Sequence, residues 1–367
     1  MKRLILAGGG HAHLAVLAEL ARLRPADVEV VLLSPYARQI YSGMLPGWMA
    51  GHYTLDQIAI PLPPLAAAAG AKFVETAVSG LDVGQRGVLT RDGASFEYDL
   101  LSLDIGPAAP PALAAPNCLS VRPIEGLVEA WPQWLDAARA APERNFRIAV
   151  AGAGAGGLEL AFAMAARAAA EGLVQVHVSL VGTDPEPVPG LPRRLRRKAL
   201  RLLDRRDITW IGGRQVEQAG ECGLALAGGT LLAAERMLMA TGAAAPDWPA
   251  AAGLAVDAGG FVRVGPDLQS LSHPGIFAAG DIAALPDPRP KSGVYAVRAG
   301  PPLAANIIAA LNGSPTRPWV PQTRALYLIS TGRRHALAAW GGLAWSGAWV
   351  WRWKDRIDRS FVARYHL

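Results

Sequence analysis

The chain has 367 residues, of which 51% are hydrophobic and 18% charged, so it is too apolar for a disordered protein and too long for one small module. Its 36 Lys and Arg against 30 Asp and Glu give a net charge of +6, which suits anionic cofactors, an anionic membrane or a nucleic acid. The two cysteines, Cys118 and Cys222, are far apart in the sequence and form no CxxC pair or metal-ligand cluster. We therefore expect two α/β domains in a reducing compartment, with no metal site and with both cysteines buried as small apolar residues.

The first predicted element is a strand at residues 4–7, which runs directly into Gly8-Gly9-Gly10-His11-Ala12-His13 and then into a helix. This beginning lacks the long apolar region of a signal peptide, so we expect no export. Glycines at positions 8 and 10 allow a tight turn and a close approach to a pyrophosphate, whose charge the N–H groups at the helix start stabilise. His13 replaces the third glycine of GxGxxG, and Ser34 stands where an acidic ribose ligand is usual. The alternative is a glycine turn with no ligand.

A second turn follows the predicted strand at 147–151 and satisfies GxGxxG fully, at Gly152, Gly154 and Gly157. The next strand, at 174–181, ends without a carboxylate for a ribose hydroxyl, which leaves NADH and NADPH both open. An arginine run at 193–197 has two interpretations: it meets a 2′-phosphate, or it is a solvated helix face. The sequence thus predicts a second dinucleotide-binding unit.

A third motif comes late in the chain, where an apolar strand ends in Gly280-Asp281. An aspartate there can accept a hydrogen bond from a sugar or ribityl hydroxyl. Downstream, the apolar spacing predicts a helix over 294–311 that ends at Asn312-Gly313. Lys291 lies in the loop before this helix, either facing a cofactor or solvated.

Near the C-terminus, five of the eleven tryptophans fall between Trp340 and Trp353, and the stretch from His335 to Trp351 has no charged residue. That stretch is at the short limit for a membrane span and contains Gly341-Gly342, so we predict a hairpin. After it, Trp349, Trp353, Ile357 and Phe361 recur at four-residue intervals, with arginines on another side, which predicts an amphipathic helix. This helix either packs on the first nucleotide-binding domain or docks on an anionic membrane.

Together with Ala240-Thr241-Gly242, these motifs make the chain resemble the two-dinucleotide-binding-domain flavoproteins, the pyridine nucleotide-disulfide oxidoreductase superfamily. The closer similarity is to type II NADH dehydrogenases and to the flavoprotein domain fused to selenide, water dikinase. It rests on the first turn, on residues 41–47 (YSGMLPG), and on the block from Lys291 through Trp351-Arg352-Trp353-Lys354. The chain departs from its relatives at 103–106, where Leu-Asp-Ile-Gly replaces Ala-Thr-Gly, and after Lys291, where the dehydrogenases' glutamines are missing.

The resemblance implies an α/β fold of two Rossmann-like domains, plus a small C-terminal hairpin and amphipathic helix. The expected FAD-binding domain comprises residues 1–110 and 257–318, the NAD(P)H-binding domain 111–256, and the C-terminal element 319–367. The residues expected to contact FAD are Gly8, Gly10, His11, Ala12, Ser34, Arg38, Val78, Gly106, Gly280, Asp281 and Lys291. Those expected to contact NAD(P)H are Gly152, Gly154, Gly157 and Glu159, and Lys291 and Tyr295 are the candidate catalytic residues.

The function implied by the resemblance is electron transfer from NAD(P)H through FAD to a quinone or similar lipophilic acceptor. Two alternatives stay open: a flavoprotein reductase that uses a chalcogen acceptor in sulfur or selenium metabolism, and a slowly turning nucleotide sensor. We expect a cytoplasmic protein, peripheral on the inner face of the cytoplasmic membrane, and a homodimer is compatible with the sequence. A nucleic-acid partner is not expected, because the arginine run has no RNA-binding motif or interleaved aromatic residues beside it.

Overall fold

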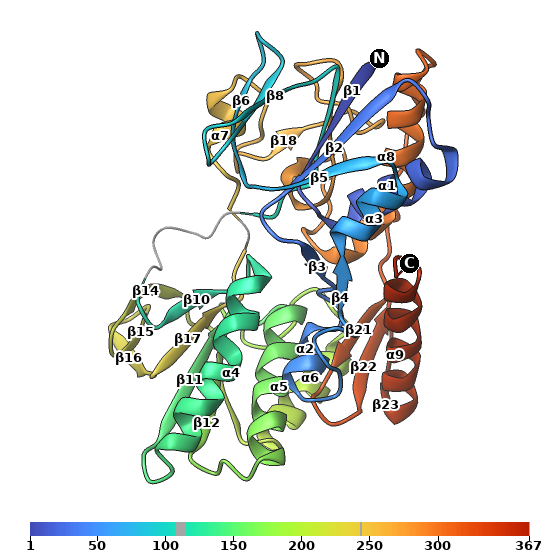
Figure 1. Ribbon diagram of the computed structural model, residues 1–367. Coiled ribbons are helices and arrows are strands. Elements are labelled where there is room, and N and C mark those ends of the chain that lie inside the picture. The colour runs from blue at the N-terminus through green and yellow to red at the C-terminus, as the bar shows by residue number, and fades with distance from the viewer. Residues whose placement is uncertain (108–114, 243, 367) are drawn as a thin grey trace.

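The computed structural model describes residues 1–107, 115–242 and 244–366, which form two α/β domains and a C-terminal element (Figure 1). The first domain is built on a five-stranded parallel sheet in the order β19-β9-β1-β2-β5. Its central strand is apolar and buried on both faces, as expected where helices and loops cover both sides of a parallel sheet. The strands are β1 (Lys2–Ala7), β2 (Val28–Ser34), β5 (Ala71–Glu75), β9 (Leu100–Leu103) and β19 (Ile276–Ala278).

Two helices of this domain, α1 (His11–Leu23) and α8 (Gly293–Leu311), pack closely against each other. A side chain at Gly300 would lie 2.8 Å from the Ala15 methyl carbon, so the glycine permits this approach. Helix α8 is long and apolar enough to cross a membrane, but half of it is buried inside the domain, which is typical of a core helix. The smaller elements are α2 (Leu45–Met49), α3 (Leu62–Ala68), α7 (Trp248–Ala251), β3 (Arg38–Ile40), β4 (Ala59–Pro61), β6 (Val78–Asp82), β7 (Gly87–Thr90), β8 (Ser95–Glu97), β18 (Val262–Arg263), β20 (Ala283–Ala284) and the 3₁₀ turn η2 (Gly280–Ile282).

The second domain repeats the plan with a parallel sheet in the order β10-β17-β11-β12-β13. Its strands are β10 (Cys118–Ser120), β11 (Phe146–Ala151), β12 (Val176–Val181), β13 (Ile208–Ile211) and β17 (Arg236–Met239). Its helices are α4 (Ile124–Ala140), α5 (Ala155–Ala170) and α6 (Arg193–Asp204), and a meander adds β14 (Val216–Gly220), β15 (Gly223–Leu226) and β16 (Thr230–Ala233). The two Rossmann-type sheets confirm the predicted fold class.

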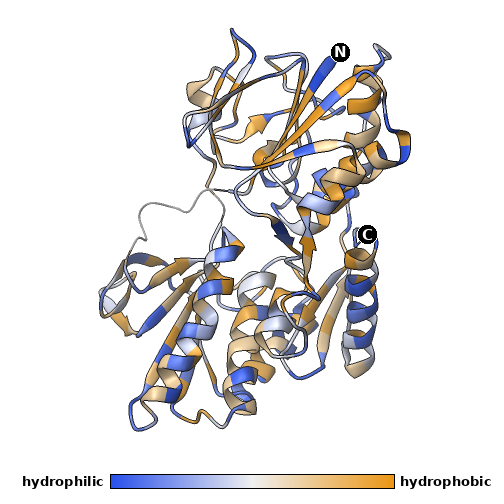
Figure 2. Cartoon of the chain, viewed as in Figure 1, coloured by the Kyte–Doolittle hydropathy of each residue, from blue (hydrophilic) through white to orange (hydrophobic). Residues whose placement is uncertain are grey.

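The C-terminal element is a three-stranded antiparallel sheet followed by a helix: β21 (Tyr327–Ser330), β22 (Ala336–Trp340), β23 (Leu343–Gly347) and α9 (Ala348–Ala363). The predicted hairpin and its Gly-Gly turn are confirmed. One face of the sheet packs on α5 and α6 of the second domain, and α9 covers the other face (Figure 1). In Figure 2, hydrophobic colour concentrates in the central strands and α8, whereas α9 carries much hydrophilic colour.

Two details of the sequence interpretation are wrong. Phe361 does not continue the outward row of Trp349, Trp353 and Ile357, because four-residue steps advance 40° beyond a full helical turn and bring it to the inner face, where it is 7% exposed. Cys222 is exposed at the β14–β15 turn, whereas Cys118 is partly buried and burial raises its pKa to about 11. The predicted domain boundary at 110/111 lies outside the described residues.

Candidate functional site

The first glycine turn joins β1 to α1 and lies against the end of β9. Gly8 has a φ of +97°, and a Cβ there would come within 2.3 Å of the Asp104 carbonyl oxygen. Only glycine accepts both the left-handed backbone and this contact. The turn therefore leads directly into α1, whose N-cap Gly10 supplies no side-chain cap.

Asp104 occupies the corner behind this turn, and its side chain is buried. Its Oδ2 accepts hydrogen bonds from the backbone N–H groups of Ala12 at 2.7 Å and His13 at 2.9 Å. A Cβ on Gly10 or on Gly280 would lie 2.4 Å from this carboxyl group, so both glycines make room for it. Burial raises the pKa of Asp104 to about 7, although the two N–H groups oppose the rise. In the sequence, Asp104 stands out only as a departure from Ala-Thr-Gly, which does not predict this role.

His13 is a structural residue in this arrangement. Its Nδ1 lies 2.6 Å from the Gly8 carbonyl oxygen, which can only accept, so Nδ1 carries the proton. The Ser102 hydroxyl, 2.8 Å from Nε2, then donates to that nitrogen. Burial lowers the pKa of His13 to about 4, which keeps the ring neutral. The ring thus replaces the close helix-to-strand contact that a third glycine would give.

His11, the first residue of α1, has a different environment. Its Nε2 is buried and has no hydrogen-bond partner among the described residues, and burial, with Arg122 nearby, lowers its pKa to about 4. A buried ring nitrogen without a partner, at a helix N-terminus that Asp104 fills only in part, fits a polar ligand such as a dinucleotide diphosphate.

Two ion pairs join the first domain to the segment around α4. Asp281, at the end of the late Gly-Asp motif, pairs with Arg122, a residue that the sequence interpretation missed. Arg38 on β3 forms a bidentate pair with Glu125 at 2.9 and 3.2 Å. Arg38 therefore lies at the domain boundary but engages a protein carboxylate. Both pairs place guanidinium groups beside the expected cofactor site.

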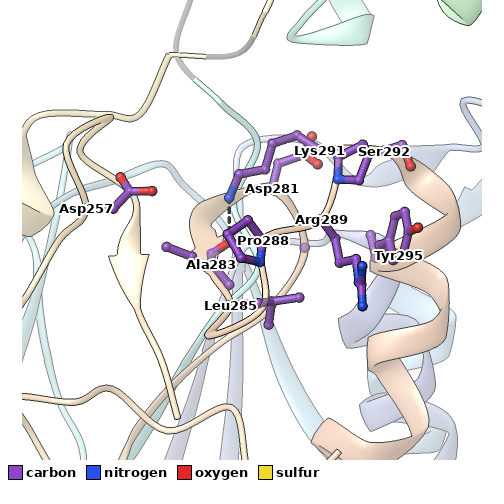
Figure 3. A pocket seen from close by; sticks show the side chains of 13 residues that line it. Asp257, Asp281, Ala283, Leu285, Pro288, Arg289, Lys291, Ser292 and Tyr295 are labelled. Carbon is purple, nitrogen blue, oxygen red and sulfur yellow. Dashed lines mark hydrogen bonds between the residues drawn. The ribbon is translucent and has the colours of Figure 1, made fainter. Parts of the chain in front are cut away.

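A pocket of about 470 Å³, partly open to solvent, lies between η2 and the start of α8 (Figure 3). Lys291 and Tyr295, the candidate catalytic residues, both line it together with Asp281. The Lys291 ammonium donates to the Ala283 carbonyl oxygen and lies 4.0 Å from the centre of the Phe261 ring. Burial lowers its pKa to about 8. The full lining comprises Asp257, Gly280, Asp281, Ala283, Ala284, Leu285, Pro288, Arg289, Pro290, Lys291, Ser292, Tyr295 and Ala296.

Three further residues expected at the FAD site, Ser34, Val78 and Gly106, have less informative surroundings. Ser34 lies beneath the turn, beside Gly9, and its hydroxyl donates to the Tyr36 carbonyl oxygen at 2.9 Å. Val78 begins β6 and is partly buried, and Gly106 is exposed just before the undescribed segment. No contact of these three residues by itself indicates a ligand.

In the second glycine turn, the surroundings of each glycine show what it contributes to the motif. Gly152 has a φ of +107°, and a Cβ on Gly157 would come within 1.8 Å of the Gly152 carbonyl oxygen. Gly154, the N-cap of α5, has open space where a side chain would be. Gly152 and Gly157 are thus required by packing, while Gly154 leaves the α5 N-terminus accessible to a ligand.

Glu159 points away from its turn and toward the C-terminal sheet. Its Oε1 accepts the Ser330 backbone N–H at 2.7 Å. Burial raises the pKa of Glu159 to about 7, against the opposing effect of the Lys354 ammonium. The residue therefore connects the second domain to β21, a placement that the motif alone does not reveal.

The loop at residues 41–47 and helix α9, which carry the closer family resemblance, meet next to the first turn. Lys354 donates to the Gly43 carbonyl oxygen at 2.5 Å and to Asp358 at 2.7 Å. The Tyr41 ring stacks on Phe361 with centroids 4.5 Å apart, and its centroid lies 5.7 Å from that of His11. The inner face of α9 is thus part of the candidate site.

Residues 2–300 match the family described as pyridine nucleotide-disulphide oxidoreductase. The chain belongs to this family. The sequence is 27% identical over 106 residues to the sulfide-quinone reductase of Aquifex aeolicus (strain VF5), a match that spans 29% of this chain and only 24% of that relative.

Two solved structures share the whole fold. The sulfide:quinone oxidoreductase from Aquifex aeolicus aligns with a TM-score of 0.82 at 20% identity, covering 100% of this chain and 91% of that one. NDH2 from Plasmodium falciparum, solved in complex with NADH, also gives 0.82, at 11% identity, with coverage of 99% and 97%. At these identities the likeness establishes the fold. With the family match, it confirms the predicted superfamily, and the protein is a flavoprotein-type oxidoreductase.

Proposed function

We propose that the protein binds FAD and passes electrons from NAD(P)H through it to a quinone or similar lipophilic acceptor. The observation that carries this proposal is the contact of α9 with the first glycine turn, through Tyr41, Phe361 and His11. The outer side of the same helix exposes tryptophans, so one element joins the expected flavin site to an apolar surface.

FAD, when bound, would accept hydride from the nicotinamide and release electrons to the acceptor. The α1 N-terminus and His11 Nε2 are suited to hold its diphosphate, and Asp281 is suited to accept from a hydroxyl. The start of α8 and the Lys291 ammonium provide positive potential at the pocket, which would stabilise negative charge on a cofactor held there.

NAD(P)H would bind at the N-terminus of α5, where Gly154 leaves room for a diphosphate. The arginine run now lies on α6, with Arg193, Arg194 and Arg197 exposed and Arg196 paired with Glu186 at 2.9 Å. This arrangement favours the solvated-face interpretation over a 2′-phosphate site. We propose that the donor is NADH or NADPH, with neither favoured, and that the rates at which they reduce the flavin should be compared.

We further propose that the C-terminal element docks on an anionic membrane. Cross-strand pairing puts Trp340 and Leu343 opposite one another, and Trp345 opposite Ala338, on the face of the sheet that α9 covers. The exposed apolar side chains of this region are Trp340, Leu343, Trp345, Trp349, Trp353 and Ile357, 37 to 55% accessible. Exposed Arg352 and Arg356 accompany them, as in helices that lie in a membrane interface.

A chalcogen acceptor is the second candidate, supported by the likeness to an NAD-dependent persulfide reductase from A. fulgidus, whose structure aligns with a TM-score of 0.75 at 18% identity. Both cysteines of the chain lie in the second domain, Cys118 in β10 and Cys222 at the β14–β15 turn. Neither lines the Lys291 pocket, which argues against chemistry through a protein thiol there.

The acceptor is tested by the oxidative half-reaction. The FAD-loaded protein, reduced with one equivalent of dithionite under anaerobic conditions, is mixed with a short-chain quinone, with polysulfide, or with oxygen-saturated buffer. We expect the quinone to restore the 450 nm absorbance at least tenfold faster than the other two. Faster reoxidation by polysulfide would favour the chalcogen reductase, and slow reoxidation by all three would favour the nucleotide sensor.

A further inference from the structure

The α1 N-terminus differs from an ordinary dinucleotide site because a carboxylate already occupies part of it. Asp104 Oδ2 takes the N–H groups of Ala12 and His13, two of the donors that a helix start offers to an anion. Its other oxygen lies toward Gly280, in the segment that precedes Asp281. A single buried side chain thus contacts both segments expected to hold FAD.

No cation among the described residues neutralises this carboxylate. The charged or titratable groups around the corner are His11 and His13 on α1, Asp281 on η2 and Arg122 before α4. Arg122 pairs with Asp281, and burial lowers the pKa values of both histidines to about 4, so they stay neutral near pH 7. A diphosphate bound at this helix end would therefore face an uncompensated negative charge.

We propose that Asp104 positions the α1 N-terminus and Gly280 for the FAD diphosphate and takes up one proton from solvent when the cofactor binds. The proton adds to the carboxyl group, which remains a hydrogen-bonding group but no longer repels the phosphates. Because burial places the pKa of Asp104 at about 7 in the FAD-free protein, this uptake falls within the physiological range. The inference rests on the proposal that the protein binds FAD.

The experiment measures FAD affinity by flavin fluorescence quenching from pH 6 to pH 8. For one linked proton, we expect the Kd of the unaltered protein to be about tenfold higher at pH 8 than at pH 6. Asp104→Asn, which keeps a carbonyl oxygen for the two N–H groups, should bind with a Kd that changes less than about twofold over this range. Lys291→Met removes the other nearby group whose pKa burial moves into this range, to about 8; whatever this change does to the affinity itself, the rise in Kd from pH 6 to pH 8 should persist in this variant.

Calorimetry of FAD binding in buffers of different ionisation enthalpy provides a readout that needs no variant. We expect uptake of about 0.9 proton per FAD at pH 8 and about 0.1 at pH 6. A pH-independent Kd with no proton uptake would overturn the role of Asp104 while leaving FAD binding intact. A dependence that persists in Asp104→Asn but vanishes in Lys291→Met would also overturn it. Failure to bind FAD at any pH would instead overturn the proposed function itself.

Discussion

The Lys354 ammonium group donates to the carbonyl oxygen of Gly43 across a distance of 2.5 Å, tying the C-terminal helix to a loop near the start of the chain. The same ammonium pairs with Asp358, and both side chains are almost fully buried. Burial opposes the charge on Lys354, but Asp358 and Glu159 raise its pKa. One buried cation thus connects α9 to the loop at 41–47 beside the candidate flavin site.

Replacing Lys354 with methionine should destabilise the protein strongly. The change leaves the Asp358 carboxylate buried without its partner, which costs about 3–5 kcal/mol in free energy of unfolding. Denaturation by urea at pH 7.5 measures the loss. Arg352→Met, on the exposed side of the same helix, should change stability by less than about 0.5 kcal/mol. Equal effects of the two variants would show that the buried pair has no special role.

Gly157→Ala should disrupt the second nucleotide turn. The added methyl carbon would lie 1.8 Å from the Gly152 carbonyl oxygen, so α5 must shift, at a cost of about 1–3 kcal/mol or more. We expect at least a tenfold rise in the Kd for NADH or NADPH, measured by nucleotide titration, and a lower melting temperature. Gly156→Ala adds the same methyl in open space and should preserve both values. Unchanged binding by Gly157→Ala would contradict this account of the turn.

Glu159 should make stability depend on pH in a defined direction. Burial raises its pKa in the folded state from 4.5 to about 7, so between these values the folded protein holds a proton that the unfolded chain has released. This contribution to the free energy of unfolding is lost as the pH rises to about 7. Above that pH, the titration of Glu159 no longer changes the stability. The free energy of unfolding of Glu159→Gln, minus that of the unaltered protein, should therefore increase by about 2 kcal/mol from pH 5 to pH 7.5. A difference that does not vary with pH would refute the assignment.

The exposed tryptophans of α9 should control membrane association. Trp349 and Trp353 stack with ring centroids 6.4 Å apart and are 50% and 38% exposed. Replacing both with serine should reduce co-sedimentation with phosphatidylglycerol vesicles by about tenfold or more, without loss of stability. Replacing both with phenylalanine is the control and should retain most binding. Equal sedimentation of the serine and phenylalanine variants would mean that α9 does not dock on the membrane.

Much of the fold was predictable because local signals coincide with it. Glycine turns flanked by apolar strands identified both nucleotide units, and the Gly341-Gly342 turn located the hairpin. The contact of Lys354 with Gly43 was not predictable, since it joins residues 311 positions apart and no local pattern encodes such a contact. Asp104 was missed for the same reason: its role depends on Gly10 and Gly280, which approach it from separate segments.

Arg122 and Phe361 illustrate two other limits of sequence reasoning. Arg122 belongs to no motif that we recognised, and only its contact with Asp281 indicates a place at the site. Phe361 was assigned to the wrong face because a four-residue repeat was extended over more than three turns of helix without its angular drift. In both cases the deciding information is the packing of α4 and α9 against the first domain.

The reductive half-reaction tests the central claim most directly. The FAD-loaded protein is mixed anaerobically with NADH or NADPH in a stopped-flow instrument, and the flavin absorbance at 450 nm is followed. We predict bleaching within seconds by at least one nucleotide, with a rate that saturates as its concentration rises. If neither nucleotide bleaches the flavin on that timescale, although dithionite does, the protein is not an NAD(P)H-linked oxidoreductase.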